Sequence, residues 1–413
     1  MTGRTTIARP SPSLLPWSIF AALIASAGLP IYIHAPKFYV DEYGVTLATL
    51  GVVLFGLRLL DVVQDPALGW LAERMRHLRG GMVAGAVGLM TASMIGLFAV
   101  APPVAPVLWF ALMLAGLFSA FSFLTICFYA QGVARAETLP RGHLGLAGWR
   151  ETGALIGISL AAVAPTVLAL ATDRPFAAFA FGFLGLGLIA LYAMRREWSA
   201  TRAAPAPSFA GLLADAGLRR LLLLALVNAA PVAVTSTLFL FFVESRLELP
   251  DLAGPLLLLF FLAAALTAPG WSRLADRIGA RRALLAGMVL AILAFAFAMR
   301  LGPGDGLAFA VISAASGAAL AADMVLLPAI FARHMARQGA EAMGFGLWSF
   351  ASKFMLAVAA VTLFPLLDLA GFRAGMENDA AALRTLTLLY AALPCGLKLI
   401  AIALLMRIPV AEV

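Results

Sequence analysis

Three charged side chains share one stripe of a long apolar segment near the N-terminus. In the stretch GLRLLDVVQDPALGW, Arg58, Asp61 and Asp65 are separated by three and by four residues. On a helix this spacing places the three side chains on one face, so the two carboxylates enter one small volume. A bound cation would relieve their mutual repulsion and their loss of hydration. Because oxygen ligands suit a hard cation, we predict that Asp61 and Asp65 bind sodium or a proton.

A structural ion pair is the alternative for the same stripe. Arg58 can neutralise one aspartate, but one arginine leaves the other carboxylate uncompensated. Charged groups at the centre of a bilayer cost at least about 2.5 to 3.5 kcal/mol each, which makes each of them a candidate functional residue. We therefore favour cation binding, with Arg58 as part of the surrounding charge network.

A second group of candidates follows in the segment that contains WRETGALIG. Arg150 is the candidate for substrate contact, with Trp149 beside it for stacking. Adjacent residues diverge by about 100° around a helix, so we expect Arg150 and Glu151 not to face one cavity directly. The alternative is an arginine near a helix end whose side chain extends to the membrane surface.

Lys353 lies in the segment SFASKFMLAVAAV and needs an acidic partner. Asp61 or Asp65 can supply it across the interface between the two halves of the chain. A lysine that changes partners when a cation binds would couple ion occupancy to conformation. Lys398 is expected to pair structurally or to extend toward the membrane surface. The weaker candidates for the site are Asn228 and Asp323.

The composition requires a membrane. Of the 413 residues, 63% are apolar and 12% are charged, and the mean hydropathy is +0.98. Soluble domains contain about 45 to 50% apolar and about 25% charged residues. The net charge of +8 is scattered in small groups between apolar segments, which argues against a nucleic-acid partner. Cys127 and Cys395 both lie in apolar runs, so free buried thiols are expected.

The apolar segments predict an all-α integral membrane protein. A helix needs about 20 mostly apolar residues to cross a hydrocarbon core of about 30 Å. The first segment lacks a small-residue cleavage site, so we interpret it as a helix and not as a signal peptide. Twelve segments qualify: Leu14 to His34, Leu47 to Leu71, Met82 to Val100, Val107 to Gln131, Leu146 to Leu170, Phe176 to Met194, Leu221 to Phe242, Leu256 to Trp271, Ala283 to Met299, Gly306 to Phe331, Gly344 to Ala370 and Leu386 to Leu405.

The chain divides into two halves of six segments each. The longest polar stretch, residues 195–220, contains RREWSATRAAPAPS and predicts a cytoplasmic linker between bundles 1–194 and 221–413. Within it, Phe209 to Ala216 forms either a short amphipathic surface helix or a plain connector. The loops GWLAERMRHLRGG and GWSRLADRIGARR occupy the same position in each half, which indicates an internal repeat. We expect their arginines to brace helix ends.

The lysines and arginines predict the orientation. With the N-terminus inside, 19 of the 29 lie on the cytoplasmic side, 6 lie on the opposite side and 4 lie within spans. Both termini are therefore expected to face the cytoplasm. No phosphate-binding loop, HExxH motif or catalytic triad spacing is present in the sequence, so neither nucleotide-driven transport nor an enzyme is supported.

At these residues the chain resembles the glycoside, pentoside and hexuronide cation symporters, the melibiose carrier family of the major facilitator superfamily. The match is strongest over Phe38 to Arg79, with YVDEYG and RLLDVVQDPALGW, and continues over WRETGALIG and from WSFASKFMLAVAAV to LLDLAGF. The resemblance implies twelve helices in two six-helix bundles that alternate in access to a central cavity.

The resemblance also implies roles for single residues. Asp61 and Asp65 correspond to the cation-site carboxylates, Ser122 to a fourth-helix hydroxyl that helps to hold the cation, and Lys353 to the eleventh-helix lysine. The sugar carriers have sugar-binding aspartates on helices one and four, where this chain has Ala25 and Thr125. The ion-binding half is thus retained while the substrate half differs. The candidate substrate-binding residues are Ala25, Thr125, Tyr129, Trp149 and Arg150.

We therefore expect a secondary active transporter that couples sodium or a proton to symport of a sugar or related small organic solute. No cofactor is expected besides this coupling ion. The expected partners are the lipid bilayer, the solute and the monovalent cation, and the protein is expected to be a monomer in the inner (plasma) membrane. A proton-coupled exporter or carrier of amphiphilic solutes is the alternative, and a membrane sensor or membrane-embedded enzyme is a remote one.

Overall fold

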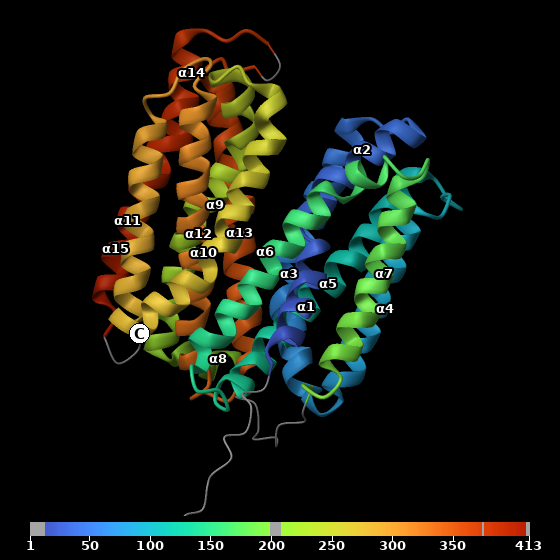
Figure 1. Ribbon diagram of the computed structural model, residues 1–413, viewed down its shortest axis with the longest axis vertical. Coiled ribbons are helices and arrows are strands. Elements are labelled where there is room, and N and C mark those ends of the chain that lie inside the picture. Colours follow the sequence, from blue (N-terminus) through green and yellow to red (C-terminus); the bar gives the residue numbers. More distant parts are fainter. Residues whose placement is uncertain (1–12, 199–207, 374–375, 410–413) are drawn as a thin grey trace, which may run out of the picture.

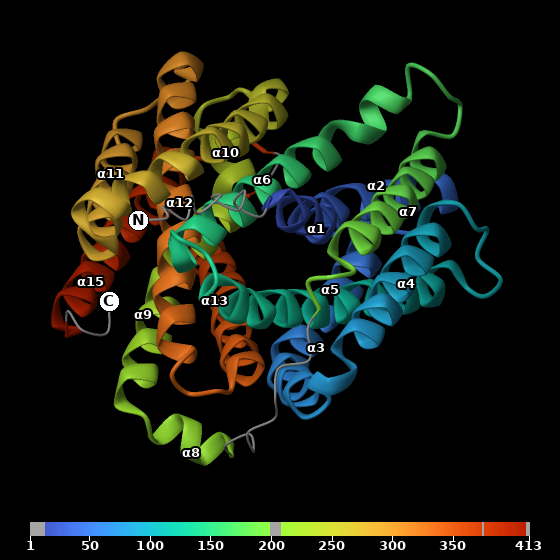
Figure 2. The same cartoon turned by 60° about the horizontal axis from the view of Figure 1, so that its bottom comes forward.

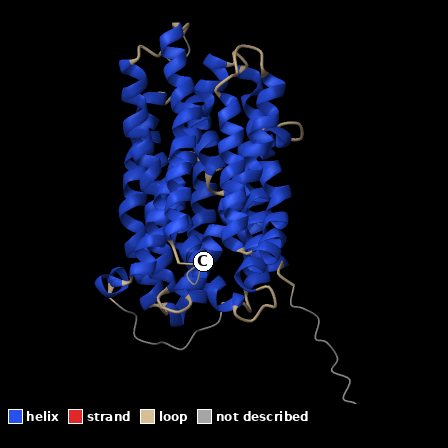
Figure 3. Ribbon diagram, turned by 90° about the vertical axis from the view of Figure 1, so that its left-hand side faces the viewer, coloured by secondary structure: helices blue, strands red, loops and turns tan. Residues whose placement is uncertain are grey.

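The computed structural model describes residues 13–198, 208–373 and 376–409, and regular structure in these ranges is helical throughout (Figure 3). Figure 1 shows two helical bundles side by side. The first contains α1 (Leu15–Ser26), α2 (Leu29–Tyr43), α3 (Leu47–Arg74), α4 (Arg79–Phe98), α5 (Pro106–Ala136), α6 (Gly142–Leu168) and α7 (Pro175–Met194). The second contains α9 (Ala216–Phe241), α10 (Ala253–Ile278), α11 (Ala280–Ala298), α12 (Gly306–Met335), α13 (Glu341–Leu369), α14 (Ala380–Thr387) and α15 (Leu393–Arg407).

The helices account for the predicted spans. In the described ranges, 10 helical segments are long and apolar enough to cross a membrane. The other two predicted spans are occupied by α3, which has 28 residues, and by the consecutive helices α1 and α2. A helix of 28 residues is about 42 Å long, more than the bilayer core requires. The predicted all-α architecture of two bundles is confirmed.

The first span was predicted as one helix, and this is wrong. α1 ends at Ser26, and α2 begins at Leu29 and continues to Tyr43. Pro30 lies in the first turn of α2. Its ring has no N–H and would clash with the carbonyl four residues earlier, so a continuous helix is broken before it. The first predicted span therefore consists of two consecutive helices.

The connection between the bundles is only partly described, because residues 199–207 of the predicted linker lie outside the described ranges. Beyond them, the short helix α8 (Phe209–Ala214) forms where a surface helix was one of two expectations. α9 then begins at Ala216, earlier than the predicted linker end at residue 220. Its N-cap is Asp215, whose carboxylate accepts a hydrogen bond from the Leu218 amide at 2.6 Å. Figure 2 shows α8 at the periphery, beside α9.

Small residues bring α1 and α6 into close contact. Gly153 and Gly157 form a GxxxG pattern on α6, and a Cβ on either glycine would overlap the backbone of Ser18 or Ala22 on α1. The Ser18 hydroxyl donates to the Trp149 carbonyl at 2.7 Å. This contact fixes α1 against α6, and both helices line the cavity described below.

The two bundles contact each other mainly through α3 with α13 and through α6 with α10. A Cβ on Gly69 of α3 would lie 2.8 Å from the Ala342 carbonyl oxygen of α13. Arg141 donates from Nε to Asp276 Oδ2 at 2.6 Å. These contacts lie toward the end that carries α8, whereas the opposite ends of the bundles stand apart in Figure 1. The molecule is therefore closed at the α8 end.

The repeated basic loops brace helices, as predicted. In the first loop region, Arg79 donates from Nη1 to Gln131 of α5 at 3.1 Å. In the second, Arg281 donates from Nη2 to the Met406 carbonyl at 2.7 Å, at the C-terminal end of α15. The second contact satisfies a carbonyl that a helix end leaves unpaired and places positive charge at the negative end of the helix dipole.

Candidate cation site and central cavity

A charge cluster joins the two bundles through Asp65 of α3 and Lys353 of α13. The Lys353 ammonium lies 3.0 Å from Asp65 Oδ2, 3.2 Å from Asp65 Oδ1 and 3.6 Å from Asp61 Oδ1. Asp61 is 3% exposed and Asp65 is fully buried. The two aspartates lie on one face of α3, one turn apart, as their spacing predicted. The lysine reaches them from the other half of the chain.

Hydroxyl and amide groups complete the cluster. The Lys353 ammonium donates to Ser122 Oγ of α5 at 2.5 Å. Ser349, one turn before Lys353, donates to Asp65 Oδ2 at 2.5 Å. Gln64 donates from Nε2 to Asp61 Oδ1 at 2.8 Å. Arg58 lies on α3, but its side chain falls outside the described part of the structure.

The Lys353 ammonium is therefore surrounded by oxygen atoms from Asp61, Asp65 and Ser122. Carboxylate and hydroxyl oxygens are ligands for a hard cation such as sodium, and the same carboxylates can accept a proton. The three oxygen-bearing side chains come from α3 and α5 of one bundle, and the lysine comes from α13 of the other. The ammonium group of Lys353, from the C-terminal bundle, is thus surrounded by carboxylate and hydroxyl oxygens of the N-terminal bundle.

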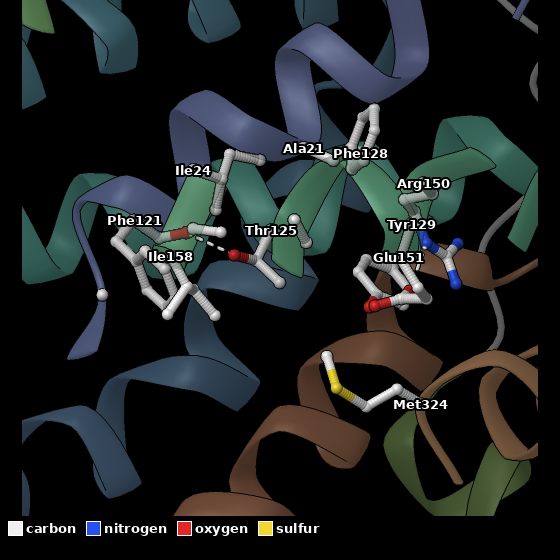
Figure 4. A pocket seen from close by; sticks show the side chains of 13 residues that line it. Ala21, Ile24, Phe121, Thr125, Phe128, Tyr129, Arg150, Glu151, Ile158 and Met324 are labelled. Atoms are coloured by element: carbon white, nitrogen blue, oxygen red, sulfur yellow. Dashed lines mark hydrogen bonds and ion pairs between the residues drawn. The ribbon is translucent and has the colours of Figure 1, made fainter. Parts of the chain in front are cut away.

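A cavity of about 200 Å³ lies between α1, α5, α6 and α12. Figure 4 shows aliphatic and aromatic side chains over most of its wall, with the charged side chains of Arg150 and Glu151 at one end. Four of the five predicted substrate-binding residues line it, namely Ala25, Thr125, Tyr129 and Arg150. The other lining residues are Ala21, Ile24, Gly28, Phe121, Phe128, Glu151, Ala154, Ile158 and Met324.

The polar end of the cavity is a compact group of three side chains. Arg150 donates from Nε to Glu151 Oε1 at 2.7 Å, and the Tyr129 hydroxyl donates to the same oxygen at 2.9 Å. The Arg150 guanidinium lies over the Tyr129 ring, 3.7 Å from its centroid. Arg150 Nη2 is buried and has no hydrogen-bond partner. The hydrogen-bonding capacity of this atom is therefore unused in the described part of the structure.

Two expectations about this end of the cavity are wrong. Arg150 and Glu151 both line the cavity, because the flexible arginine side chain bends back toward its neighbour despite the 100° turn between them. Trp149 does not line it, since it is 48% exposed and lies on another face of α6. Tyr129 of α5 provides the ring that stacks on Arg150, in place of Trp149.

The charge cluster and the cavity share α5, and α13, which carries Lys353, contacts a residue of the cavity wall. α5 contributes Ser122 to the cluster and Thr125 and Tyr129 to the cavity. α13 contributes Lys353 to the cluster and Phe345, whose ring lies 5.1 Å from that of Tyr129. Phe345 thus connects the helix that carries Lys353 with Tyr129 of the cavity wall.

The sequence missed Ser349, Gln64 and Ser119 as members of the cluster. Ser119 donates to Gln64 Oε1 at 2.9 Å and so orients the amide that bonds Asp61. A signal was present for two of them, because Ser349 lies four residues before Lys353 and Ser119 three residues before Ser122. Such spacing identifies residues on the same helical face once the partner residue is known.

A second charge cluster lies inside the C-terminal bundle. Lys398 of α15 pairs with Asp323 of α12 and donates to Asn228 Oδ1 of α9 at 2.6 Å. The expectation of a structural pair for Lys398 thus agrees with this geometry, whereas extension to the membrane surface does not, because the residue is only 4% exposed.

Comparison with known proteins agrees with the fold. A family model described as "MFS/sugar transport protein" matches residues 18–412. The chain belongs to this family. The match confirms the major facilitator assignment, and the resemblance to the melibiose carriers is consistent with it. As a family member, the protein is a multi-pass membrane transporter and not an enzyme.

Solved structures share the fold of this transporter at low sequence identity. A bacterial homologue of the iron transporter ferroportin in an outward-facing state has a TM-score of 0.71 and 13% identity, covering 96% of this chain and 99% of that chain. The human organic anion transporter MFSD10 (TETRAN) has a TM-score of 0.65 and 15% identity, covering 95% and 98%. A search of curated proteins found no match. At these identities the likeness concerns the fold alone.

Proposed function

We propose that this transporter couples sodium or a proton to the movement of a small organic solute, and that Asp61 and Asp65 bind the coupling ion. The observation that supports the proposal best is the position of the Lys353 ammonium, 3.0 Å from Asp65 and 2.5 Å from Ser122. It occupies the place that a monovalent cation would take among the same oxygen ligands. The lysine thus acts as an internal competitor for the coupling ion.

This competition suggests how ion binding changes conformation. When the ion binds Asp61 and Asp65, the attraction between Asp65 and Lys353 is screened, and a contact between α3 and α13 is weakened. The two bundles are then released from the arrangement closed at the α8 end. Because coupling free energies are reciprocal, a solute that favours the same rearrangement must also favour ion binding.

The arginine count supports an orientation with the α8 end at the cytoplasmic face. On that assignment the cavity is closed toward the cytoplasm and the described conformation is outward-facing. We propose an inner (plasma) membrane location with cytoplasmic termini, and a monomer as the transporting unit, since one chain supplies both the ion ligands and the cavity.

Uphill uptake into proteoliposomes tests the coupling. Asp61→Asn and Asp65→Asn are each compared with wild type under an inward sodium gradient and under an inward proton gradient, with a panel of labelled sugars. Asp173→Asn is the matched control, because Asp173 is exposed in the connection between α6 and α7. Loss of accumulation in both site variants but not in the control supports the proposal. Unchanged accumulation in Asp65→Asn contradicts it.

An amphiphilic solute is a second candidate for the cargo. The cavity wall is mostly aliphatic and aromatic, and Ala25 and Thr125 stand where the sugar carriers have aspartates. The Thr125 hydroxyl donates to the Phe121 carbonyl of its own helix at 2.8 Å. A solute with an apolar body and one polar group directed to Arg150 fits this wall. Counterflow with labelled sugars and with labelled amphiphiles, in parallel, distinguishes the two classes.

A further inference from the structure

The cluster of Asp323, Lys398 and Asn228 lies in the C-terminal bundle, apart from the cation site between the bundles. Asp323 is 9% exposed, Lys398 is 4% exposed and Asn228 is equally buried. Lys398 uses its ammonium to bond Asp323 Oδ2 and Asn228 Oδ1. The other carboxylate oxygen, Asp323 Oδ1, is buried and has no hydrogen-bond partner. A pair with a purely structural role would be expected to satisfy both oxygens, because an unpaired buried acceptor is costly.

A small cavity adjoins this pair. It measures about 40 Å³, and both Asp323 and Lys398 line it, together with the hydroxyl-bearing Thr235 and Ser316. A water molecule needs roughly 10 to 15 Å³ of such space, so the cavity has room for a few water molecules but not for an organic solute. Lys398 supplies the local positive charge, which disfavours a metal cation. A proton is the ligand that fits both the volume and the charge.

We propose that Asp323 is a second proton-binding site, which takes up its proton at Oδ1 from water in this cavity. The proton enters the cavity from outside as a hydronium ion, which gives it up and remains as neutral water. The carboxylate becomes a neutral acid, and Lys398 keeps its charge and its hydrogen bond to Asn228. The attraction between Asp323 and Lys398 is thereby weakened, and with it a contact between α12 and α15. The charge of the bundle interior rises by one.

The surroundings of Asp323 contain few other charges. Among the residues that line the small cavity, which come from α9, α10, α11, α12 and α15, only Asp323 and Lys398 are charged. Behind α12, Met324 lines the central cavity, where Arg150 and Glu151 pair with each other. The residue that takes up the proton therefore stands next in sequence to one that faces the solute cavity. Proton uptake at Asp323 can thus alter the wall of that cavity through α12.

Infrared difference spectroscopy of the full-length protein in lipid nanodiscs tests this site without any transport assay. Spectra are compared as the pH is lowered from mildly alkaline to acidic, and the carbonyl band of a neutral carboxylic acid is followed. Asp323→Asn removes the group but leaves Lys398 unpaired, so Asp323→Asn combined with Lys398→Met is measured as well. Asp61→Asn and Asp65→Asn serve as controls for the first site.

We expect the acidification difference spectra of wild type and of both control variants to share one carboxylic-acid component that is missing from the spectrum of the double variant. A double-variant spectrum with the same carboxylic-acid intensity as the wild-type spectrum overturns the proposal. Because this measurement does not depend on uptake, it remains informative if the coupling proposed for Asp61 and Asp65 fails.

Discussion

At the scale of single residues, three largely buried charged side chains in the described part of this transporter each have a specific partner. Lys353 bonds Asp65 and Ser122, Arg150 bonds Glu151, and Lys398 pairs with Asp323. Removing one member of a buried pair costs about 3 to 5 kcal/mol, because an uncompensated charge is left behind. The partners are therefore essential for stability as well as for the proposed function.

The contributions of Glu151 and Tyr129 to the stability of the buried Arg150 can be ranked. Glu151→Gln leaves the buried guanidinium without its counter-ion and should cost about 3 to 5 kcal/mol. Tyr129→Phe removes one hydrogen bond to a carboxylate, worth about 1.5 to 3 kcal/mol, but retains the ring under Arg150. We expect the melting temperature in detergent to fall further for Glu151→Gln than for Tyr129→Phe. The reverse order would mean that Glu151 does not compensate Arg150.

At the scale of elements, close helix contacts and caps set the positions of the lining residues. Gly153 and Gly157 admit α1 to the surface of α6. Asp215 starts α9 by accepting from the Leu218 amide. The two glycines determine how closely α1 and α6 pack, and Asp215 determines where α9 begins.

A larger side chain at the α1 and α6 contact should separate the two helices. Gly157→Leu places its side chain in the backbone of Ala22, so we expect a strong loss of folded protein, measured by size-exclusion chromatography after extraction. Gly185→Ala is the control, because a Cβ at Gly185 on α7 meets no atom within 4 Å. This control should elute like wild type. Loss of folded protein in both variants would show that the close contact with Ala22 is not the cause of the effect.

The N-cap of α9 predicts a pH dependence. Partial burial raises the pKa of Asp215, but hydrogen bonds from the Leu218 amide and from His334 outweigh it and hold the pKa below its usual 3.8. The stabilisation is therefore complete above pH 3.8 and is lost as the pH falls through the lower folded-state value.

Two variants of Asp215 distinguish the contribution of its helix cap to stability from the contribution of its negative charge. Asp215→Ala should cost about 1 kcal/mol at neutral pH, whereas Asp215→Asn, which can still cap, should cost less. In the acid range, the melting temperature of Asp215→Asn should fall less steeply than that of wild type. Equal slopes for both proteins would show that Asp215 does not contribute to acid sensitivity.

At the scale of the whole molecule, the two bundles meet at one end, and the charge cluster of Asp61, Asp65 and Lys353 lies between them. Arg141 and Asp276 close the α8 end together with the contacts of α3 and α13. Asp276→Asn removes a bond from Arg141, so the closed arrangement should be less populated. We expect a cysteine placed near this end to react faster with a membrane-impermeant thiol reagent in the variant. An unchanged rate would mean that other contacts hold the closure.

Most of the fold could be predicted, because the hydropathy of each segment alone indicates whether it forms a membrane-spanning helix. The stripe of Asp61 and Asp65 was visible because two carboxylates four residues apart must share a helical face. The partners from other helices were less visible. Ser349 became recognisable only once Lys353 was placed, and the exposed position of Trp149 depends on how α6 rotates against α1. That rotation is a result of packing, which periodicity alone does not determine.

The most direct test of the account is the ion dependence of the melting temperature in wild type, Lys353→Ala and Asp65→Asn. Without its internal competitor, Lys353→Ala should melt lower in the absence of the ion but bind it about tenfold more tightly, which corresponds to about 1.4 kcal/mol. Titration with sodium chloride, with choline chloride as the control salt, and titration with acid distinguish the two ions. We predict a larger ion-induced stabilisation in Lys353→Ala than in wild type, and none in Asp65→Asn. Equal or smaller stabilisation in Lys353→Ala for both ions would contradict the proposal that Lys353 occupies the cation site.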